Sequence, residues 1–420
     1  MPMSKRLSNR FRAIVRITRI CADICGADVF DPKFRINIRT ILVLVIIQLS
    51  IVFMAYTVYV GFNVDGDWKV ILQVLSVGGC TLVQGYCKLV NCLREKNNFR
   101  FLINELNSLY EKYEQNDADC RLFLYKGIQQ LTFIMKLSAF VVILMVVGMG
   151  LVTLVLSVVF NTHVLIVQCL IPGFDPTTGK GFLWINIIQI WFIAVGGFGF
   201  YAGDMAFFTP LSQISTFRGI LKCKFCDLNE TLADEPGNKE KSFNGVKDIL
   251  IFHQRYIVFL EVTRDTYYWV ILVQIGTYSI GIICTMFSIH LGTWPGGYVY
   301  MIYCFVMMLV YCHMGSLVEI TNEGVVSSCY NDVNWYELSV SERRMLHTML
   351  RMAQNTAGLT IGSVLPLSMN TVEQQDKASN ANAFADECAL HATSPAAQQQ
   401  AVGSHKCGKK KLSLCNELHG

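Results

Sequence analysis

Few residues in this 420-residue sequence have the types and spacing that catalysis or metal binding requires. Cys223 and Cys226 form one C-x-x-C pair, but neither a second pair nor a pair of histidines lies beside it. A zinc or redox site usually needs those further ligands. We also find no nucleophile–base pair, H-E-x-x-H motif or phosphate loop. The sequence therefore predicts neither an enzyme nor a protein with a metal or cofactor.

Charged residues at the ends of apolar runs are the second chemical feature. Asp204 follows the run 183–203, and Glu319 follows the run 298–318. Acids inside a membrane often mark an ion path. Each of these acids, however, lies about twenty residues after the start of its run, at the expected membrane surface. We therefore expect solvated helix ends, and we expect Lys88 to extend its amino group to the surface near the end of the run 70–90.

The composition explains why apolar runs dominate. Hydrophobic residues make up 53% of the chain and charged residues 16%, against about 25% charged in ordinary soluble domains. The net charge of +4 is too small to neutralise a nucleic-acid backbone. These values argue against a soluble enzyme, a disordered regulator and a nucleic-acid-binding protein.

Six runs with few or no charges are long enough to cross a lipid bilayer. At 1.5 Å per residue, twenty helical residues cover about 30 Å, the thickness of the hydrocarbon core. The sequence thus predicts an all-α fold, a polytopic membrane helix bundle over residues 41–319 with six complete spans. The expected spans are residues 41–60, 70–90, 137–160, 183–203, 267–289 and 298–318.

The distribution of positive charge predicts the orientation of this bundle. Segments on one side of the membrane carry 26 Lys and Arg residues, and segments on the other side carry two. Cytoplasmic loops are enriched in Lys and Arg, so we expect a cell-membrane protein with a cytoplasmic N-terminus. Residues 1–40 contain nine of these cations and are expected to form a basic segment that lies on the bilayer surface.

Two amphipathic stretches lie on the expected cytoplasmic side. Leu102, Leu106, Leu109 and Tyr113 form one helical stripe, which suggests that the second span continues as a helix beyond the membrane. Within the cytoplasmic region 320–355, Ser339 or Ser341 is expected to cap a second helix. Packing within the chain and contact with another subunit both explain such stripes. For the second helix the candidate subunit-interface residues are Leu346, Met349, Leu350 and Met352.

The last part of the chain changes character. Residues 356–371 begin as an apolar segment, but Pro366 interrupts it and Glu373 ends it, so we expect an incomplete, truncated or replaced seventh span. Residues 372–420 contain seven Leu, Ile, Val or Phe residues in 49 positions. Such a segment buries too little apolar surface to offset the entropy of ordering, and we expect a disordered tail.

The segment from Asn334-Trp335-Tyr336 to the motifs 356–360 (TAGLT) and 366–371 (PLSMNT) resembles the end of an insect odorant receptor. Together with the span pattern, the resemblance covers roughly residues 1–371. It implies a receptor that binds small volatile molecules and gates a non-selective cation channel as a hetero-oligomer, a tetramer, with the olfactory co-receptor. Residues of about 339–354 would anchor subunits. The pore-lining half would begin near Thr356, where this chain departs from the family pattern and is expected to lack part of the pore wall.

In that family the ligand lies among the second to sixth spans, in an apolar pocket in the outer half of the bundle. Depth along the spans and the resemblance together select the candidate ligand-binding residues, which are not marked by any motif. Each of them also suits plain helix packing. They are Leu75, Met149, Thr153, Trp191, Phe192, Tyr278 and Tyr303. Cys169 and Cys284 fall toward the same face, and a disulfide between them stays open.

Three other classes of membrane protein remain as alternatives. A gustatory receptor of the same superfamily has the same topology, and the 366–371 motif favours the odorant family over it. A G-protein-coupled receptor has an external N-terminus, which the charge distribution opposes. A secondary transporter is expected to show internal repeats and broken helices with paired polar residues at mid-membrane, and the spans show neither clearly.

Overall fold

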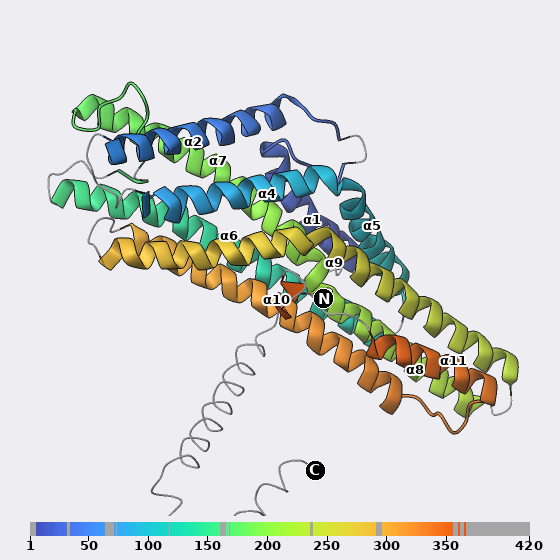
Figure 1. Ribbon diagram of the computed structural model, residues 1–420. Coiled ribbons are helices and arrows are strands. Elements are labelled where there is room, and N and C mark those ends of the chain that lie inside the picture. Colours follow the sequence, from blue (N-terminus) through green and yellow to red (C-terminus); the bar gives the residue numbers. More distant parts are fainter. Residues whose placement is uncertain are drawn as a thin grey trace, which may run out of the picture. The chain divides into compact units, whose positions relative to one another are not determined.

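The computed structural model describes most of the chain up to residue 366. The described residues are 6–31, 34–63, 71–72, 74–116, 118–159, 165–167, 169–235, 238–290, 296–355, 360–361 and 365–366. Nearly all of them are helical, which confirms the all-α class (Figure 1). The predicted disordered tail 372–420 lies outside the described residues, as does most of the expected seventh span 356–371.

Ten α-helices and one π-helical segment account for the described fold. In chain order they are α1 (Leu7–Ile24), α2 (Ile38–Asn63), the π-helical segment η1 (Val74–Gly79), α4 (Cys80–Arg94), α5 (Lys96–Tyr113), α6 (Ala118–Val159), α7 (Gly179–Ser212), α8 (Ile214–Asp234), α9 (Lys239–His290), α10 (Gly297–Asn331) and α11 (Val340–Gln354). The two-residue strands β1 (Thr360–Ile361) and β2 (Leu365–Pro366) pair antiparallel.

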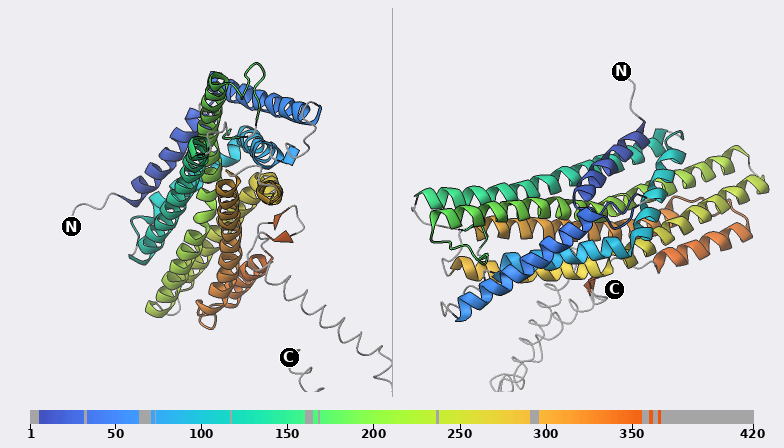
Figure 2. Two further views of the ribbon diagram at one scale, coloured as in Figure 1. Left: turned by 90° about the vertical axis from the view of Figure 1, so that its left-hand side faces the viewer. Right: turned by 90° about the horizontal axis from the view of Figure 1, so that it is seen from above.

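Five stretches of helix among the described residues are long and apolar enough to cross a membrane: α2, α6, α7 with α8, α9 and α10. They contain five of the six predicted spans. The remaining predicted span, 70–90, is divided between η1 and α4, so the count of six complete spans stays a prediction. The helices α6, α7, α9 and α10 run side by side in Figure 2.

These long helices differ in how much of their apolar surface the chain itself covers. In the apolar stretch of α2 only 6% of the residues are buried, against 44% in that of α9. A helix that is apolar on all sides and yet not covered by the rest of the chain is stable only in a hydrocarbon environment such as the interior of a bilayer. We infer that α2 lies at the edge of the bundle against lipid, whereas α9 is central.

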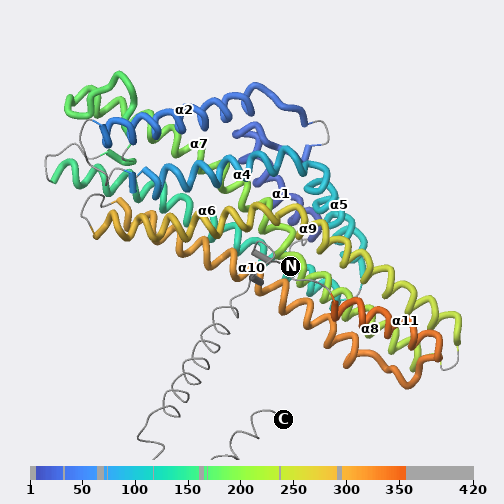
Figure 3. Tube along the Cα trace, viewed as in Figure 1, coloured from blue at the N-terminus to red at the C-terminus, as the bar shows by residue number. Residues whose placement is uncertain are grey.

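Several helices extend well beyond one bilayer thickness. The 52 residues of α9 correspond to about 78 Å of helix, against a hydrocarbon core of about 30 Å. The first half of α9 packs with α8 and α11 (Figure 3). Aromatic side chains fill this region, which we call the distal aromatic core: Tyr113, Phe217, Phe252, Tyr256 and Phe259.

The stripe predicted on α5 is buried, in agreement with packing inside the chain. Leu102, Leu106, Leu109 and Tyr113 are all inaccessible to solvent or nearly so. The expectation of one continuous helix from the second span is wrong, because α4 ends at Arg94 and α5 begins at Lys96. Glu95, between them, has a ψ of 23°, which turns the chain out of the α4 axis.

A hydrogen bond from α9 replaces the one that a proline removes near the end of α7. Pro210 has no amide hydrogen, so the carbonyl of Ala206, one turn earlier, loses its partner within the helix. The hydroxyl of Tyr267 in α9 donates to this carbonyl at 2.5 Å. The bend toward α8 is therefore stabilised by a hydrogen bond between two membrane-length helices.

The start of α11 follows the predicted capping pattern. The Ser339 side chain accepts from the backbone N–H of Glu342, and the Glu342 side chain accepts from the backbone N–H of Ser339 at 2.7 Å. This reciprocal pair satisfies two amide groups that the first helical turn leaves open. The expectation that Ser339 or Ser341 caps this helix is thus confirmed, with Ser339 as the cap.

The Tyr267–Ala206 hydrogen bond can be tested by Tyr267→Phe. The variant leaves a buried carbonyl without a donor, and we expect the free energy of unfolding to fall by about 1–3 kcal/mol. The measurement is the thermal unfolding midpoint of the detergent-solubilised protein. Tyr298→Phe, which removes the hydroxyl of an exposed tyrosine in α10, is the matched control and should leave the midpoint unchanged. Equal midpoints for the two variants would contradict this role.

A buried histidine beside the distal aromatic core predicts a pH dependence. His253 is buried, its Nε2 has no hydrogen-bond partner among the described residues, and burial lowers its pKa from 6.5 to about 4. Between pH 6.5 and 4 the unfolded chain therefore binds a proton that the folded chain does not, so stability should fall with pH, by on the order of 3 kcal/mol at pH 4.

Unfolding midpoints measured between pH 7 and pH 4 for the wild type and His253→Phe test this prediction. The variant should lose part of the acid sensitivity, because Phe does not titrate. Identical pH profiles for the two proteins would show that His253 is not the group responsible.

Candidate ligand-binding cavity

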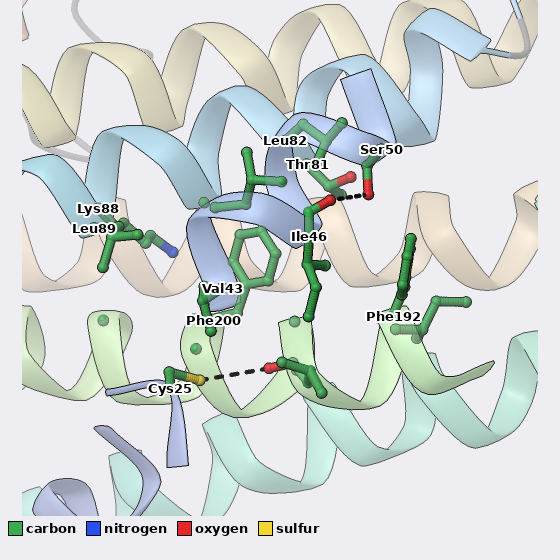
Figure 4. Close-up of a pocket in the computed structure, with 18 of the residues that line it drawn as sticks. Cys25, Val43, Ile46, Ser50, Thr81, Leu82, Lys88, Leu89, Phe192 and Phe200 are labelled. Carbon is green, nitrogen blue, oxygen red and sulfur yellow. Dashed lines mark hydrogen bonds between the residues drawn. The ribbon is translucent and has the colours of Figure 1, made fainter. Parts of the chain in front are cut away.

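The described part of the bundle forms a partly open cavity of about 260 Å³. Its walls come from α2, η1, α4, α6 and α7, from the end of α1 with the residues that follow it, from the connection before α7, and from Tyr303 of α10. Figure 4 shows Ile46 and Val43 of α2 facing Leu82 of α4 and Phe200 of α7 across this space. Three helices of membrane length, α2, α6 and α7, thus surround one apolar space together with the shorter α4.

The lining is almost wholly apolar, and most of its polar side chains are already engaged. The hydroxyl of Ser50 donates to the carbonyl of Ile46 at 2.8 Å, within α2. The hydroxyl of Thr81 donates to the carbonyl of Val77 in the preceding turn. These internal bonds leave little for a polar ligand to bind, so the walls suit hydrocarbon groups.

One end of the cavity is closed by the connection before α7. The side-chain amide of Gln189 donates to the carbonyls of Val167 and Cys169 at 2.9 and 3.0 Å, and its oxygen accepts from the Val167 amide at 3.1 Å. The hydroxyl of Thr57 in α2 accepts from the Leu170 amide at 2.8 Å. These bonds hold the connecting segment over the ends of α2 and α7. Both Cys169 and Cys284 are free thiols, so the chain holds no disulfide there.

A glycine lets α2 approach η1 closely. At Gly78 an added Cβ would lie 2.3 Å from the sulfur of Met54, well inside van der Waals contact. Both residues line the cavity. The absence of a side chain at position 78 therefore makes room for the Met54 side chain between α2 and η1.

The opposite end of the cavity holds a buried ion pair. The Lys88 amino group lies 2.5 Å from Oδ1 of Asp204, and the side chains are 6% and 0% exposed. The hydroxyl of Tyr311 in α10 donates to the same carboxylate oxygen at 2.6 Å. The expectation of a solvated helix end at Asp204 is wrong, as is that of a Lys88 side chain extended to the surface. The two charges neutralise each other inside the bundle because α4 and α7 place them at the same depth.

The predicted ligand-binding residues fall into three groups. Met149, Phe192 and Tyr303 line the cavity. Leu75 and Trp191 are exposed on the outside of their helices, Trp191 to 62%. Thr153 and Tyr278 are buried away from the cavity. The Thr153 hydroxyl bonds within α6 to the Met149 carbonyl, and the Tyr278 ring packs against that of Tyr303.

Three parts of the lining were not predicted. α2, the first span, forms one wall although the pocket was expected among the second to sixth spans, and no described lining residue comes from α9. Ala22 lies at the end of α1 and Cys25 directly follows that helix, in a segment that was expected only to lie on the bilayer surface. Lys88 was not among the predicted ligand-binding residues, although its position along the second predicted span indicates that it can meet Asp204. Lys88 and Asp204 each lie about twenty residues after the start of predicted spans that run in the same direction, so their depths match.

The residues predicted for a subunit interface are mostly covered by the chain itself. Leu346 and Met349 are buried and Leu350 is partly buried, whereas Met352 is 52% exposed. α11 packs against α9 and α10. A second subunit would therefore meet α11 mainly on the side of Met352.

Taken together, apolar helices of membrane length around an apolar cavity define a multi-pass membrane protein that can take up a small ligand. The sequence model of the family described as "7tm Odorant receptor" matches residues 68–377. The chain therefore belongs to the odorant receptor family. This match favours an odorant receptor over a gustatory receptor or a secondary transporter.

Individual relatives agree with this assignment. The chain is 28% identical over 389 residues to the Drosophila melanogaster protein named "Putative odorant receptor 83c", with 89% of this chain and 96% of that protein covered. The solved olfactory receptor OR5 of Machilis hrabei has the same fold, with a TM-score of 0.68 at 17% identity over 89% of this chain and 97% of that one. Its complex with eugenol gives a TM-score of 0.67 at 17% identity, over 89% of this chain and 96% of that one.

The contrast between Phe192 and its neighbour provides a test of the cavity. Phe192 lines it and stacks on Phe53 with 6.5 Å between ring centroids, whereas Trp191 points away. Phe192→Ala enlarges the space, and we expect it to improve the binding of bulky apolar ligands relative to small ones by about tenfold. Ligand-induced thermal shifts of the purified protein across a homologous series measure this preference. Trp191→Ala is the control, and an equal change in both variants would contradict the assignment.

Proposed function

We propose that this protein is an odorant receptor subunit that binds small, mainly apolar volatile molecules in the cavity among α2, α4, α6 and α7. The observation that carries the proposal is an apolar cavity of about 260 Å³ within the membrane-length helices. Family membership and the eugenol complex of the Machilis hrabei receptor support it. Met149, Phe192 and Tyr303 are the proposed ligand contacts among the residues selected from the sequence.

The chemistry of the lining fits such ligands. A volatile molecule offers few hydrogen bonds, so burial of its apolar surface, at about 25 cal/mol per Å², has to supply most of the affinity. The best small ligands reach about −1.5 kcal/mol per heavy atom. A molecule of about ten heavy atoms therefore reaches micromolar affinity without a dense set of polar contacts.

We further propose that the chain acts in the cell membrane with a cytoplasmic N-terminus, in a hetero-oligomer with an olfactory co-receptor that conducts cations. The excess of Lys and Arg on the predicted inner side supports this orientation. Gating requires the ligand to bind the open state more tightly than the closed state. A change from 1:99 to 99:1 needs about 5.5 kcal/mol of differential affinity over the assembly.

Expression in cells that lack other receptors tests this function. Volatile-evoked inward current should require both this chain and the co-receptor, and an N-terminal epitope should be stained only after permeabilisation. Cells with the co-receptor alone are the control. Surface-expressed protein that gives no current with a broad panel of volatiles would refute the channel function, and staining of intact cells would refute the orientation.

The composition of residues 372–420 bears on which subunit lines the channel pore. We propose that this tail does not line the pore and that the co-receptor supplies more of the pore wall in the assembly. The cation selectivity should then differ from that of channels formed by the same co-receptor with a receptor whose last segment is apolar. Equal conductance and selectivity would contradict this part of the proposal while leaving ligand binding intact.

A further inference from the structure

We propose that Lys88 is the polar anchor of the cavity and that it selects ligands carrying one hydrogen-bond-accepting oxygen, such as a ketone, ether or alcohol, on an apolar skeleton. This inference rests on the proposed function and narrows its ligand class. Lys88 is the one charged side chain among the cavity-lining residues that the structure describes. Its labelled position in Figure 4 lies at one end of the space, beside Leu89.

The amino group of Lys88 has donors to spare. An ammonium group carries three N–H donors. One of them is directed to Asp204, 2.5 Å away, and the group also lies 4.9 Å from the centre of the Phe200 ring. Among the described residues Lys88 has no second hydrogen-bond acceptor. A ligand oxygen at this end of the cavity would supply one.

The surroundings of Lys88 fix where its amino group lies. Asp204 is itself held by the hydroxyl of Tyr311, so the carboxylate is fixed from α10 as well as from α4. At Gly203 an added Cβ would lie 3.0 Å from Cδ of Lys88, so the glycine makes room for the lysine stem against α7. A donor fixed in this way loses little conformational freedom when it binds a ligand.

The carboxylate beside Lys88 can accept a further hydrogen bond. Oδ2 of Asp204 is buried and has no hydrogen-bond partner among the described residues. A carboxylate oxygen only accepts hydrogen bonds, so this atom calls for a donor and not for the accepting oxygen of a ketone or ether. Because Lys88 and not Asp204 lines the cavity, the spare N–H donors of Lys88 are the observation that carries the choice of ligand.

Tyr303 also lines the cavity, but its phenol is a neutral donor, and the other hydroxyl and amide groups around the cavity are already engaged. The hydroxyls of Ser50 and Thr81 donate to carbonyls of their own helices. Both N–H groups of the Gln189 amide donate to backbone carbonyls at the opposite end. A ligand oxygen is therefore best accommodated at Lys88, which also orients the apolar part of the ligand along α2 and α7.

Discrimination should be strong because the donor is charged and shielded from water. A hydrogen bond to a charged group is about twice as strong as one between neutral groups. We expect a ketone to bind about 10- to 100-fold more tightly than the hydrocarbon with the same carbon skeleton. A site with an unsatisfied polar group rejects the analogue that lacks the matching atom.

The experiment uses the purified full chain and a matched pair of probes, a ketone and the alkane of the same skeleton. Binding of each is measured by ligand-induced thermal shift and by competition, for the wild type and the double variant Lys88→Met/Asp204→Leu, which has no donor at either position. The double variant removes both charges together, so no unpaired carboxylate is left to unfold the bundle. Lys136→Met, which removes an exposed lysine that does not line the cavity, is the control.

The wild type and Lys136→Met should prefer the ketone by about tenfold or more, whereas the double variant should bind both probes alike and keep the wild-type affinity for the alkane. Persistence of the preference in the folded double variant would overturn the role of Lys88, and so would equal binding of the two probes by the wild type. Neither of these results affects the proposed odorant function. A wild-type protein that binds no volatile at all would instead refute that function and this inference with it.

Discussion

A carboxylate buried among apolar helices has to be neutralised, and the way Asp204 is neutralised determines how four helices meet. Lys88 brings α4 against α7, and Tyr311 brings α10 against the same oxygen. Tyr311 in turn stacks on Phe207, whose ring contacts that of Tyr267 in α9. Removal of one partner from a buried pair costs about 3–5 kcal/mol, which is a large part of the stability of a typical domain.

The same region joins the membrane-embedded part of the chain to the part beyond it. Tyr267 satisfies the carbonyl that Pro210 leaves open, close to where α7 passes into α8. Directly after α7, the side-chain oxygen of Gln213 accepts a hydrogen bond from the Tyr110 hydroxyl at 2.7 Å. Hydrogen bonds and ring contacts therefore connect the cavity end at Lys88 and Asp204 with the junction of α7 and α8.

Local patterns in the sequence predicted much of the fold, because the length and polarity of a helix are local properties. The uncharged runs located α2, α6 and α10, and the period of Leu102, Leu106 and Leu109 identified the buried face of α5. The break at Glu95 and the pairing of Lys88 with Asp204 were missed. The two charged residues lie 116 positions apart, and hydropathy gives the depth of each but not which helices are neighbours. For the same reason depth and the family resemblance together selected both Phe192, which lines the cavity, and Trp191, which is exposed on the outside of α7.

The length of α9 determines how far its two ends move when the helix tilts. Its 52 residues form one helix that passes from beside Tyr303 to α11. If the helix pivots about its middle by about 5°, each end of its roughly 78 Å is displaced by about 3 Å. Tyr278 lies about 20 Å from the middle of α9, so a movement of about 2 Å there corresponds to a displacement of about 3 Å at the end beside α11.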